Sequence, residues 1–176
     1  MGRLFYIMGK SASGKDTIYQ RLLRNPEFSL ERLVIYTTRP IRDGELDGRE
    51  YHFVTEEDFQ KLKAAGKIIE DRGYETVYGL WRYFTADNMD LEEKNYLGIG
   101  TLESYEKLKA YYGEEKIRPI YIEVEDGERL KRAIAREETQ VVPKYEEMCR
   151  RFLADAQDFS EEKIRQAGIS HRFSNM

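Results

Sequence analysis

The strongest constraint on the fold is a glycine-bracketed loop near the amino terminus, residues 9–17 (GKSASGKDT). It follows a short apolar run, Leu4–Met8, which predicts a buried parallel strand, and it precedes apolar residues at helical spacing. A strand, a glycine-bracketed loop and a helix in this order are the context that a phosphate-binding loop requires. In such a loop the backbone N–H groups and the positive end of the helix face an anion. The alternative is an ordinary strand-to-helix turn that contains glycine. Such a turn does not require the strand, the glycine spacing and the helix to occur together.

The side chains of the loop have separate expected roles. Lys15 is placed to reach the β- and γ-phosphates of a nucleotide as a mobile point charge. Ser or Thr normally follows this lysine and ligates Mg²⁺, but here Asp16 and then Thr17 follow. We expect Asp16 to take a water-mediated place at the metal and Thr17 to bind a phosphate oxygen, so both are candidate metal-site residues. The candidate ATP-binding residues in the loop are Gly9, Ser11, Ala12, Ser13, Gly14, Lys15, Asp16 and Thr17.

Composition limits the class of protein. The chain has 176 residues, of which 40% are hydrophobic, and this favours one soluble globular domain. No apolar run approaches the ~18 residues of a membrane span and the start is no signal peptide, so we expect a cytoplasmic protein without a membrane partner. The net charge of −4 argues against a nucleic-acid partner. The single cysteine, Cys149, excludes disulfide frameworks, and we expect it to be buried in a helix.

A second motif lies at residues 37–54 (TTRPIRDGELDGREYHFV), after a strand that is predicted at 33–36. Arg39 and Arg42 would form a pair of guanidinium groups able to bind a phosphate bidentately. From these residues alone, a solvated charged loop is the alternative, and most charged runs of this kind are such loops.

Next to a phosphate loop, this segment resembles the GMP-binding segment of guanylate kinases. The resemblance implies that two arginines and a tyrosine hold the phosphate of GMP, and that a glutamate accepts the N1–H and 2-amino groups of guanine. A Tyr-Gly pair further along matches the family, with its tyrosine as a phosphate contact. The GMP-binding residues that the resemblance implies are Arg39, Arg42, Tyr51, Glu70, Tyr78 and Gly79.

Some positions depart from the family pattern. Ile35 and Leu80 stand where the family has hydroxyl side chains that help to read guanine, and Gly98 and Gly100 stand where it has two aspartates near the acceptor and the metal. These departures leave the identity of the phosphate acceptor open.

The carboxyl-terminal half continues the alternation of strands and helices. We expect a loop and helix at 81–95, strands at 96–100 and 118–124, and a helix capped by Asp126. A mobile loop at 137–144 and a helix at 145–158 follow. The resemblance implies that Arg132, Arg136 and Arg151 clamp the ATP phosphates and that Asn175 lies near the adenine, although such helical arginines alone would more often face solvent.

The whole pattern predicts a three-layer α/β/α fold with a parallel sheet. The resemblance adds the strand order 2-3-1-4-5, a core at about 1–36 and 91–176, a nucleotide-accepting lobe at about 37–90, and a lid at about 137–144. It implies phosphoryl transfer from Mg-ATP to GMP, with Lys15, Arg39, Arg132, Arg136 and Arg151 as catalytic residues. Two alternatives stay open: a kinase for another acceptor, such as another nucleoside monophosphate or ribose 1,5-bisphosphate, and a catalytically silent binding module. The oligomeric state is not indicated.

Overall fold

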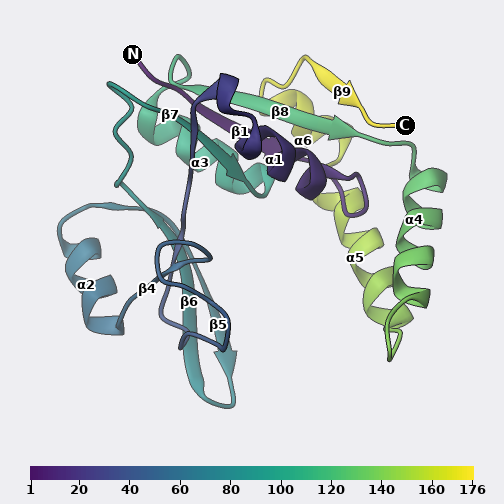
Figure 1. The fold of residues 1–176 in the computed structure, drawn as a ribbon, viewed down its shortest axis with the longest axis horizontal. Coiled ribbons are helices and arrows are strands. Elements are labelled where there is room, and N and C mark those ends of the chain that lie inside the picture. The colour runs from purple at the N-terminus through teal and green to yellow at the C-terminus, as the bar shows by residue number, and fades with distance from the viewer.

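Five parallel strands form the central sheet of the computed structural model, which describes residues 1–176 (Figure 1). The strands are β1 (Leu4–Met8), β2 (Leu30–Arg32), β7 (Asn95–Ile99), β8 (Ile117–Glu123) and β9 (Arg172–Ser174). They lie in the order β2-β7-β1-β8-β9, and every neighbouring pair is parallel. Numbered among themselves along the chain, they give the order 2-3-1-4-5, which confirms the prediction.

Helices cover both faces of this sheet. On one face, α1 (Lys15–Arg24) places Tyr19 against Ile7 of β1. On the other face, α3 (Leu102–Tyr112) and α6 (Glu161–Gln166) pack on the alternate side chains of the same strand, among them Tyr6. The alternation of side chains along a strand thus divides one apolar run between two cores. The three-layer prediction is confirmed.

A second sheet contains β3 (Tyr36–Thr37), β4 (His52–Phe53), β5 (Ile68–Thr76) and β6 (Gly79–Ala86), in the order β4-β3-β6-β5. One face is covered by α2 (Glu56–Ala64), whose Phe59 packs edge-on against Phe84 of β6. Thr55 begins this helix with a capping box, in which it exchanges hydrogen bonds with Asp58. Figure 1 shows this sheet and α2 projecting from the core as one lobe, within the segment expected to receive the phosphate acceptor.

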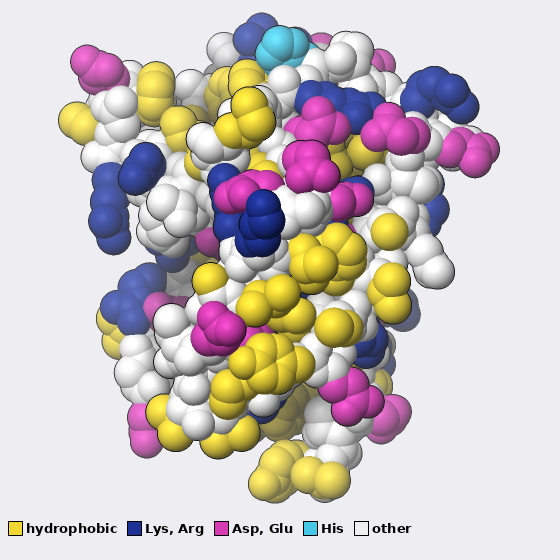
Figure 2. Space-filling view, turned by 90° about the vertical axis from the view of Figure 1, so that its right-hand side faces the viewer, with side chains coloured by type: hydrophobic (Ala, Val, Ile, Leu, Met, Phe, Trp, Pro, Cys, Tyr) yellow, Lys and Arg dark blue, Asp and Glu magenta, His cyan; other side chains and the backbone are white.

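Two further helices form an arm on the other side of the molecule (Figure 1). They are α4 (Asp126–Glu138) and α5 (Tyr145–Asp158), and a short 3-10 helix, η1 (Pro26–Phe28), completes the list of elements. Figure 2 faces this arm and shows apolar side chains gathered along it. The exposed apolar residues of the arm are Ile134, Val141, Val142, Tyr145 and Leu153. No helix of the structure combines the length and the apolar character needed to cross a bilayer.

The strand expected at 33–36 and the loop and helix expected at 81–95 were wrong. The apolar run serves two sheets: β2 ends at Arg32, and the chain crosses to enter the second sheet at Tyr36. Residues 79–86 instead form β6, which pairs with β5 to make a long hairpin. Its inward and outward faces both carry aromatic and polar side chains, so no alternation of hydrophobicity marked it as a strand.

Smaller corrections concern the arm. The carboxylate of Glu125, not Asp126, caps α4 by accepting the backbone N–H of Glu128 at 3.0 Å. The helix continues to Glu138, so the connecting loop begins two residues later than expected. Cys149 is exposed on α5, because the buried position of that turn is taken by its neighbour Met148. The short helix α6 was not foreseen.

Tyr6 explains why this chain has glycines at positions 98 and 100. Its ring is buried and lies across β7, where Tyr6 and Gly98 are paired in register. A Cβ on Gly98 would come within 2.6 Å of the Tyr6 ring, and one on Gly100 would meet the Tyr6 hydroxyl. Burial, and then the charge of Glu70, raises the pKa of Tyr6, so its hydroxyl stays neutral. The tyrosine therefore occupies the space that side chains at positions 98 and 100, for which the resemblance implies aspartates, would need.

We expect Gly100→Ala to destabilise the protein by about 1–3 kcal/mol, because the added methyl group overpacks against Tyr6. The double variant Tyr6→Phe/Gly100→Ala should recover part of that loss, since the clashing oxygen is gone. Urea unfolding of the wild type, both single variants and the double variant measures the coupling. Additive effects of the two substitutions would contradict this packing.

Candidate active site

The turn between β1 and α1 is shaped to leave backbone N–H groups free. Gly14, the residue before α1, has φ 81°, and no side chain caps the helix. Ala12 also has a positive φ, 61°, which is strained for a residue with a Cβ. A Cβ on Gly9 would lie 2.6 Å from the carbonyl oxygen of Ile122, so this approach to β8 requires glycine. An uncapped helix start and a strained loop together form a site for an anion.

Polar side chains in the loop also lack partners. The hydroxyl of Ser13 is buried and makes no hydrogen bond. Lys15, the first residue of α1, has only a loose contact, 3.7 Å, between its Nζ and the carboxylate of Asp16, which is 85% exposed. A buried hydroxyl without a partner points to a ligand that supplies one. The loop residues predicted to bind ATP phosphates are therefore gathered around one concave turn.

The end of the chain closes over this loop. Asn175, which follows β9, donates from its amide to the carbonyl oxygen of Ser13 at 2.9 Å. Its own carbonyl oxygen accepts a bond from Arg132 of α4 at 3.1 Å. The expected adenine neighbour thus lies against the phosphate loop, and one expected clamp arginine is joined to the loop through it. The sequence reasoning placed both residues near ATP but did not foresee this link between them.

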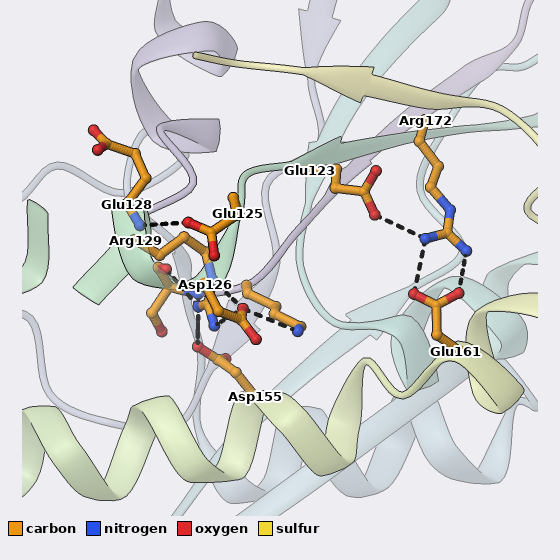
Figure 3. Close-up of polar contacts among 10 residues, drawn as sticks. Glu123, Glu125, Asp126, Glu128, Arg129, Asp155, Glu161 and Arg172 are labelled. Atoms are coloured by element: carbon orange, nitrogen blue, oxygen red, sulfur yellow. Dashed lines mark hydrogen bonds and ion pairs between the residues drawn. The ribbon is translucent and has the colours of Figure 1, made fainter. Parts of the chain in front are cut away.

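Arg129 forms the hub that holds the loop to the arm (Figure 3). Its side chain is 1% exposed and donates to the carbonyl oxygen of Ser11 at 2.9 Å, to Asp155 at 3.2 Å and to Asp126 at 2.8 Å. Asp155 in turn accepts the backbone N–H of Ser11 at 2.8 Å. The bond to Arg129 lowers the pKa of Asp126. Sequence reasoning missed Arg129 and Asp155, since the partners lie far apart along the chain.

The outer arginines of the arm do not contact the loop. Arg136 is exposed near the end of α4, and Arg151 on α5 pairs with Glu147 at 3.1 Å. Together with Arg150, Arg151 lowers the pKa of Glu147 to about 2. These arginines would need movement of the arm to reach a nucleotide at the loop.

In the second sheet, Arg39 is buried and bound to Glu45. Two hydrogen bonds join its guanidinium to that carboxylate, at 2.8 and 3.0 Å, and a third reaches the carbonyl oxygen of Pro40. The bonds to Glu45 raise the pKa of Arg39, and the same interaction lowers the pKa of Glu45. Glu45 also accepts the backbone N–H of Arg42, so one carboxylate organises both predicted phosphate-binding arginines. The glutamate is part of the recognised segment, but no role was predicted for it.

The remaining predicted acceptor residues divide into two groups. Tyr51 lies beside Arg39, whose guanidinium is 5.4 Å from the centre of the tyrosine ring, and the side chain of Arg42 is exposed in the same turn. Tyr78 and Gly79 instead occupy the tip of the β5–β6 hairpin, where Tyr78 is 81% exposed and stacks on Trp81.

Glu70 lies at the junction of the two sheets. Its carboxylate is buried and accepts hydrogen bonds from Thr85 at 2.9 Å and from Ser104 at 3.2 Å. Because Ser104 belongs to α3, these bonds connect the lobe to the core.

Comparison with known proteins places this geometry in a family. The family profile described as guanylate kinase matches residues 1–162. The chain belongs to the guanylate kinase family. A guanylate kinase from Wolbachia sp. subsp. Brugia malayi is 36% identical over 124 residues, which are 70% of this chain and 60% of that protein. One from Porphyromonas gingivalis is 32% identical over 121 residues, or 66% of this chain and 63% of that protein. The chain thus covers less than two thirds of the length of either relative.

A solved structure agrees with the fold. The crystal structure of guanylate kinase from Anaplasma phagocytophilum matches 99% of this chain and 77% of its own, with a TM-score of 0.61 and 21% sequence identity. At that identity the match concerns the fold alone. The guanylate kinase resemblance seen in the sequence is confirmed at the level of family and fold, and the roles of individual residues remain predictions.

We expect Arg129→Met to destabilise this guanylate kinase family member by at least about 2 kcal/mol, because it leaves the largely buried Asp155 without its cation. Asp155→Asn should cost less, since the amide oxygen still accepts the N–H of Ser11. Urea unfolding measures both. Arg21→Met, at an exposed position of α1, is the matched control and should change stability by less than about 0.5 kcal/mol. Equal effects at positions 21 and 129 would show that the hub contributes nothing.

Proposed function

We propose that the protein transfers the γ-phosphoryl group of Mg-ATP to GMP and releases ADP and GDP. The observation that carries the proposal is the phosphate loop, with its uncapped helix start, its unpartnered Ser13 hydroxyl and Lys15 beside it. Membership of the guanylate kinase family and the named relatives support the choice of donor and acceptor.

Catalysis in this proposal is positioning and charge neutralisation, without a covalent intermediate. The loop amides and Lys15 hold the phosphates of ATP, and Arg132, which is linked to the loop through Asn175, contributes a further cation. Arg39, Arg42 and Tyr51 hold the phosphate of the acceptor, and Glu70 marks the base end of its site. Arg136 and Arg151 join only when the arm closes, which would also exclude water. Tyr78 and Gly79 would approach the acceptor only by movement of the hairpin tip.

The residues at the start of α1 fit a magnesium ion. Mg²⁺ usually keeps several waters and takes one or two carboxylates together with substrate phosphates. Asp16 is an exposed carboxylate within 3.7 Å of Lys15 Nζ, and Thr17 follows it in the first helical turn. These two side chains would hold the ion. Bound there, Mg²⁺ supplies neutralisation of the charge on the phosphates.

A second candidate function keeps the donor and changes the acceptor. It is favoured by Tyr6, which fills the space where family members carry acidic side chains, and by Ile35 and Leu80 in place of hydroxyl residues. Another nucleoside monophosphate or ribose 1,5-bisphosphate would then be phosphorylated. A silent binding module would have no use for the free Lys15 and the unpartnered Ser13 hydroxyl.

We expect Lys15→Ala to lower kcat for GMP-dependent ADP release by at least about 100-fold, because the transferring phosphoryl group loses its nearest cation. The assay compares GMP, dGMP, AMP, UMP, CMP, ribose 1,5-bisphosphate and no acceptor. Lys131→Ala, an exposed lysine of α4, is the control and should keep wild-type turnover. Turnover by Lys15→Ala close to that of the wild type would refute the site, and preference for another acceptor would select the second candidate function.

We expect Asp16→Ala to raise the Mg²⁺ concentration for half-maximal activity roughly 30-fold, because two unit charges about 4 Å apart in water interact by about 1 kcal/mol and Mg²⁺ carries two charges. Titration of activity against free Mg²⁺ at saturating ATP provides the measurement. Glu27→Ala removes an exposed carboxylate from the 3-10 helix and should leave the titration unchanged. An unchanged Mg²⁺ requirement in Asp16→Ala would exclude Asp16 from the metal site.

A further inference from the structure

Strand β6 sends alternate side chains to the two faces of the second sheet. Arg82 and Phe84 point toward α2, where both contact the ring of Phe59. Tyr83 lies between them and therefore points to the opposite face. A cavity of about 430 Å³ opens on that face, and its lining residues are Ile35, Tyr51, Arg72, Tyr74, Trp81 and Tyr83. No role was predicted for Tyr83 from the sequence.

Tyr83 lies beside two residues that are expected to hold the acceptor phosphate. Its ring centre is 5.6 Å from that of Tyr51, and the guanidinium carbon of Arg39 is 5.4 Å from the Tyr51 ring. The strands bring these groups together, because Tyr83 is paired in register with Thr37, whose hydroxyl accepts the backbone N–H of Arg39 at 3.1 Å. After the bonds to Glu45, a side-chain hydrogen bond with Tyr83 is a further cause of the raised pKa of Arg39.

The chemistry of the two groups decides the direction of this hydrogen bond. A guanidinium has N–H donors and no acceptor, so the Tyr83 oxygen accepts from Arg39. The proton of the phenol is not used in that contact and is able to donate to an anion. A hydroxyl that accepts a hydrogen bond from a cation is also polarised, which makes it a better donor to a phosphate oxygen.

An acceptor phosphate needs a donor of this kind, because Arg39 is almost fully occupied. Its guanidinium makes two hydrogen bonds to Glu45 and one to the carbonyl oxygen of Pro40, besides the one to Tyr83. Of the five N–H donors, at most one is then left for a phosphate. The hydroxyl of Tyr83 restores a second donor at the same place.

The tyrosine that the resemblance assigns to the phosphate does not meet this need where it stands. Tyr78 is 81% exposed at the tip of the β5–β6 hairpin and stacks on Trp81. Tyr83 belongs to the same hairpin but lies in the cavity, next to Tyr51. The hairpin hydroxyl that is already in contact with Arg39 is therefore that of Tyr83.

We propose that the Tyr83 hydroxyl binds the acceptor phosphate, donating its proton to a phosphate oxygen while it accepts a hydrogen bond from Arg39. This inference rests on the proposed function and adds a residue to its acceptor site. The edge-on contact with Tyr51 holds the Tyr83 ring from the side, so the hydroxyl keeps its position before the acceptor binds.

The experiment compares GMP with guanosine, which has the same base and ribose but no phosphate. It measures kcat and KM for GMP at saturating Mg-ATP, and the inhibition constant of guanosine as a competitor of GMP. For Tyr83→Phe we expect KM for GMP to rise roughly tenfold, the effect of losing one hydrogen bond to a charged group. The value of kcat should stay within about twofold, and the inhibition constant of guanosine should not change.

A matched control removes a hydroxyl elsewhere. Tyr111→Phe deletes a hydroxyl of α3 that donates to Asp87 at 3.1 Å, and all three constants should equal those of the wild type. A purely structural effect of Tyr83→Phe would weaken guanosine and GMP alike, so the guanosine measurement separates a phosphate contact from a change in the shape of the cavity.

Two results would overturn the inference while the proposed function stands. One is an unchanged KM for GMP in Tyr83→Phe, and the other is an equal loss of affinity for GMP and guanosine. A wild type without GMP-dependent ADP release would instead remove the proposed function itself, and this inference with it.

Discussion

The interaction on which the site depends most is the buried guanidinium of Arg129. It binds the backbone of the phosphate loop at Ser11 and the acidic side chains of both arm helices. Its central carbon also lies 4.6 Å from the centre of the Phe152 ring. A buried cation without these partners would be strongly unfavourable, so the loop and the arm adopt their relative positions together. The backbone strain at Ala12 is held in place by the same contacts. The geometry of the loop and the position of the arm therefore depend on each other.

On the acceptor side of the molecule, the feature that matters is a bulky neutral side chain where charged side chains are expected. Tyr6 fills the space beside Gly98 and Gly100, the two positions at which the resemblance implies aspartates, so the junction where Glu70 and Arg72 lie carries no such charge. Glu70 is held at this junction by hydrogen bonds from two hydroxyl groups and lies 3.7 Å from the guanidinium of Arg72.

Much of the core was predictable from the sequence because its signals are local. The apolar strand and glycine loop before α1, the capping residue Thr55 and the helix at 145–158 each need only neighbouring residues to be recognised. The division of the run at 30–37 between two sheets depends on long-range pairing, which no local pattern contains. The contacts of Arg129 with Ser11 and Asp155 could not be predicted for the same reason. The contact of Tyr6 with Gly98 was within reach, since the predicted strand order already made β1 and β7 neighbours.

The pairing of Arg39 with Glu45 gives a buried cation its counter-ion. Three hydrogen bonds, to Glu45 and to Pro40, use three of the five N–H donors of Arg39. A side-chain hydrogen bond with Tyr83 also raises the pKa of Arg39, so at most one N–H donor remains for a phosphate under the proposed function, and the carboxylate need not leave. A site that had to break a bidentate ion pair would lose most of the binding energy of its phosphate contact. Under the proposed function, Glu45 would keep the guanidinium oriented before and after binding, so the acceptor would meet a cation whose position is already fixed.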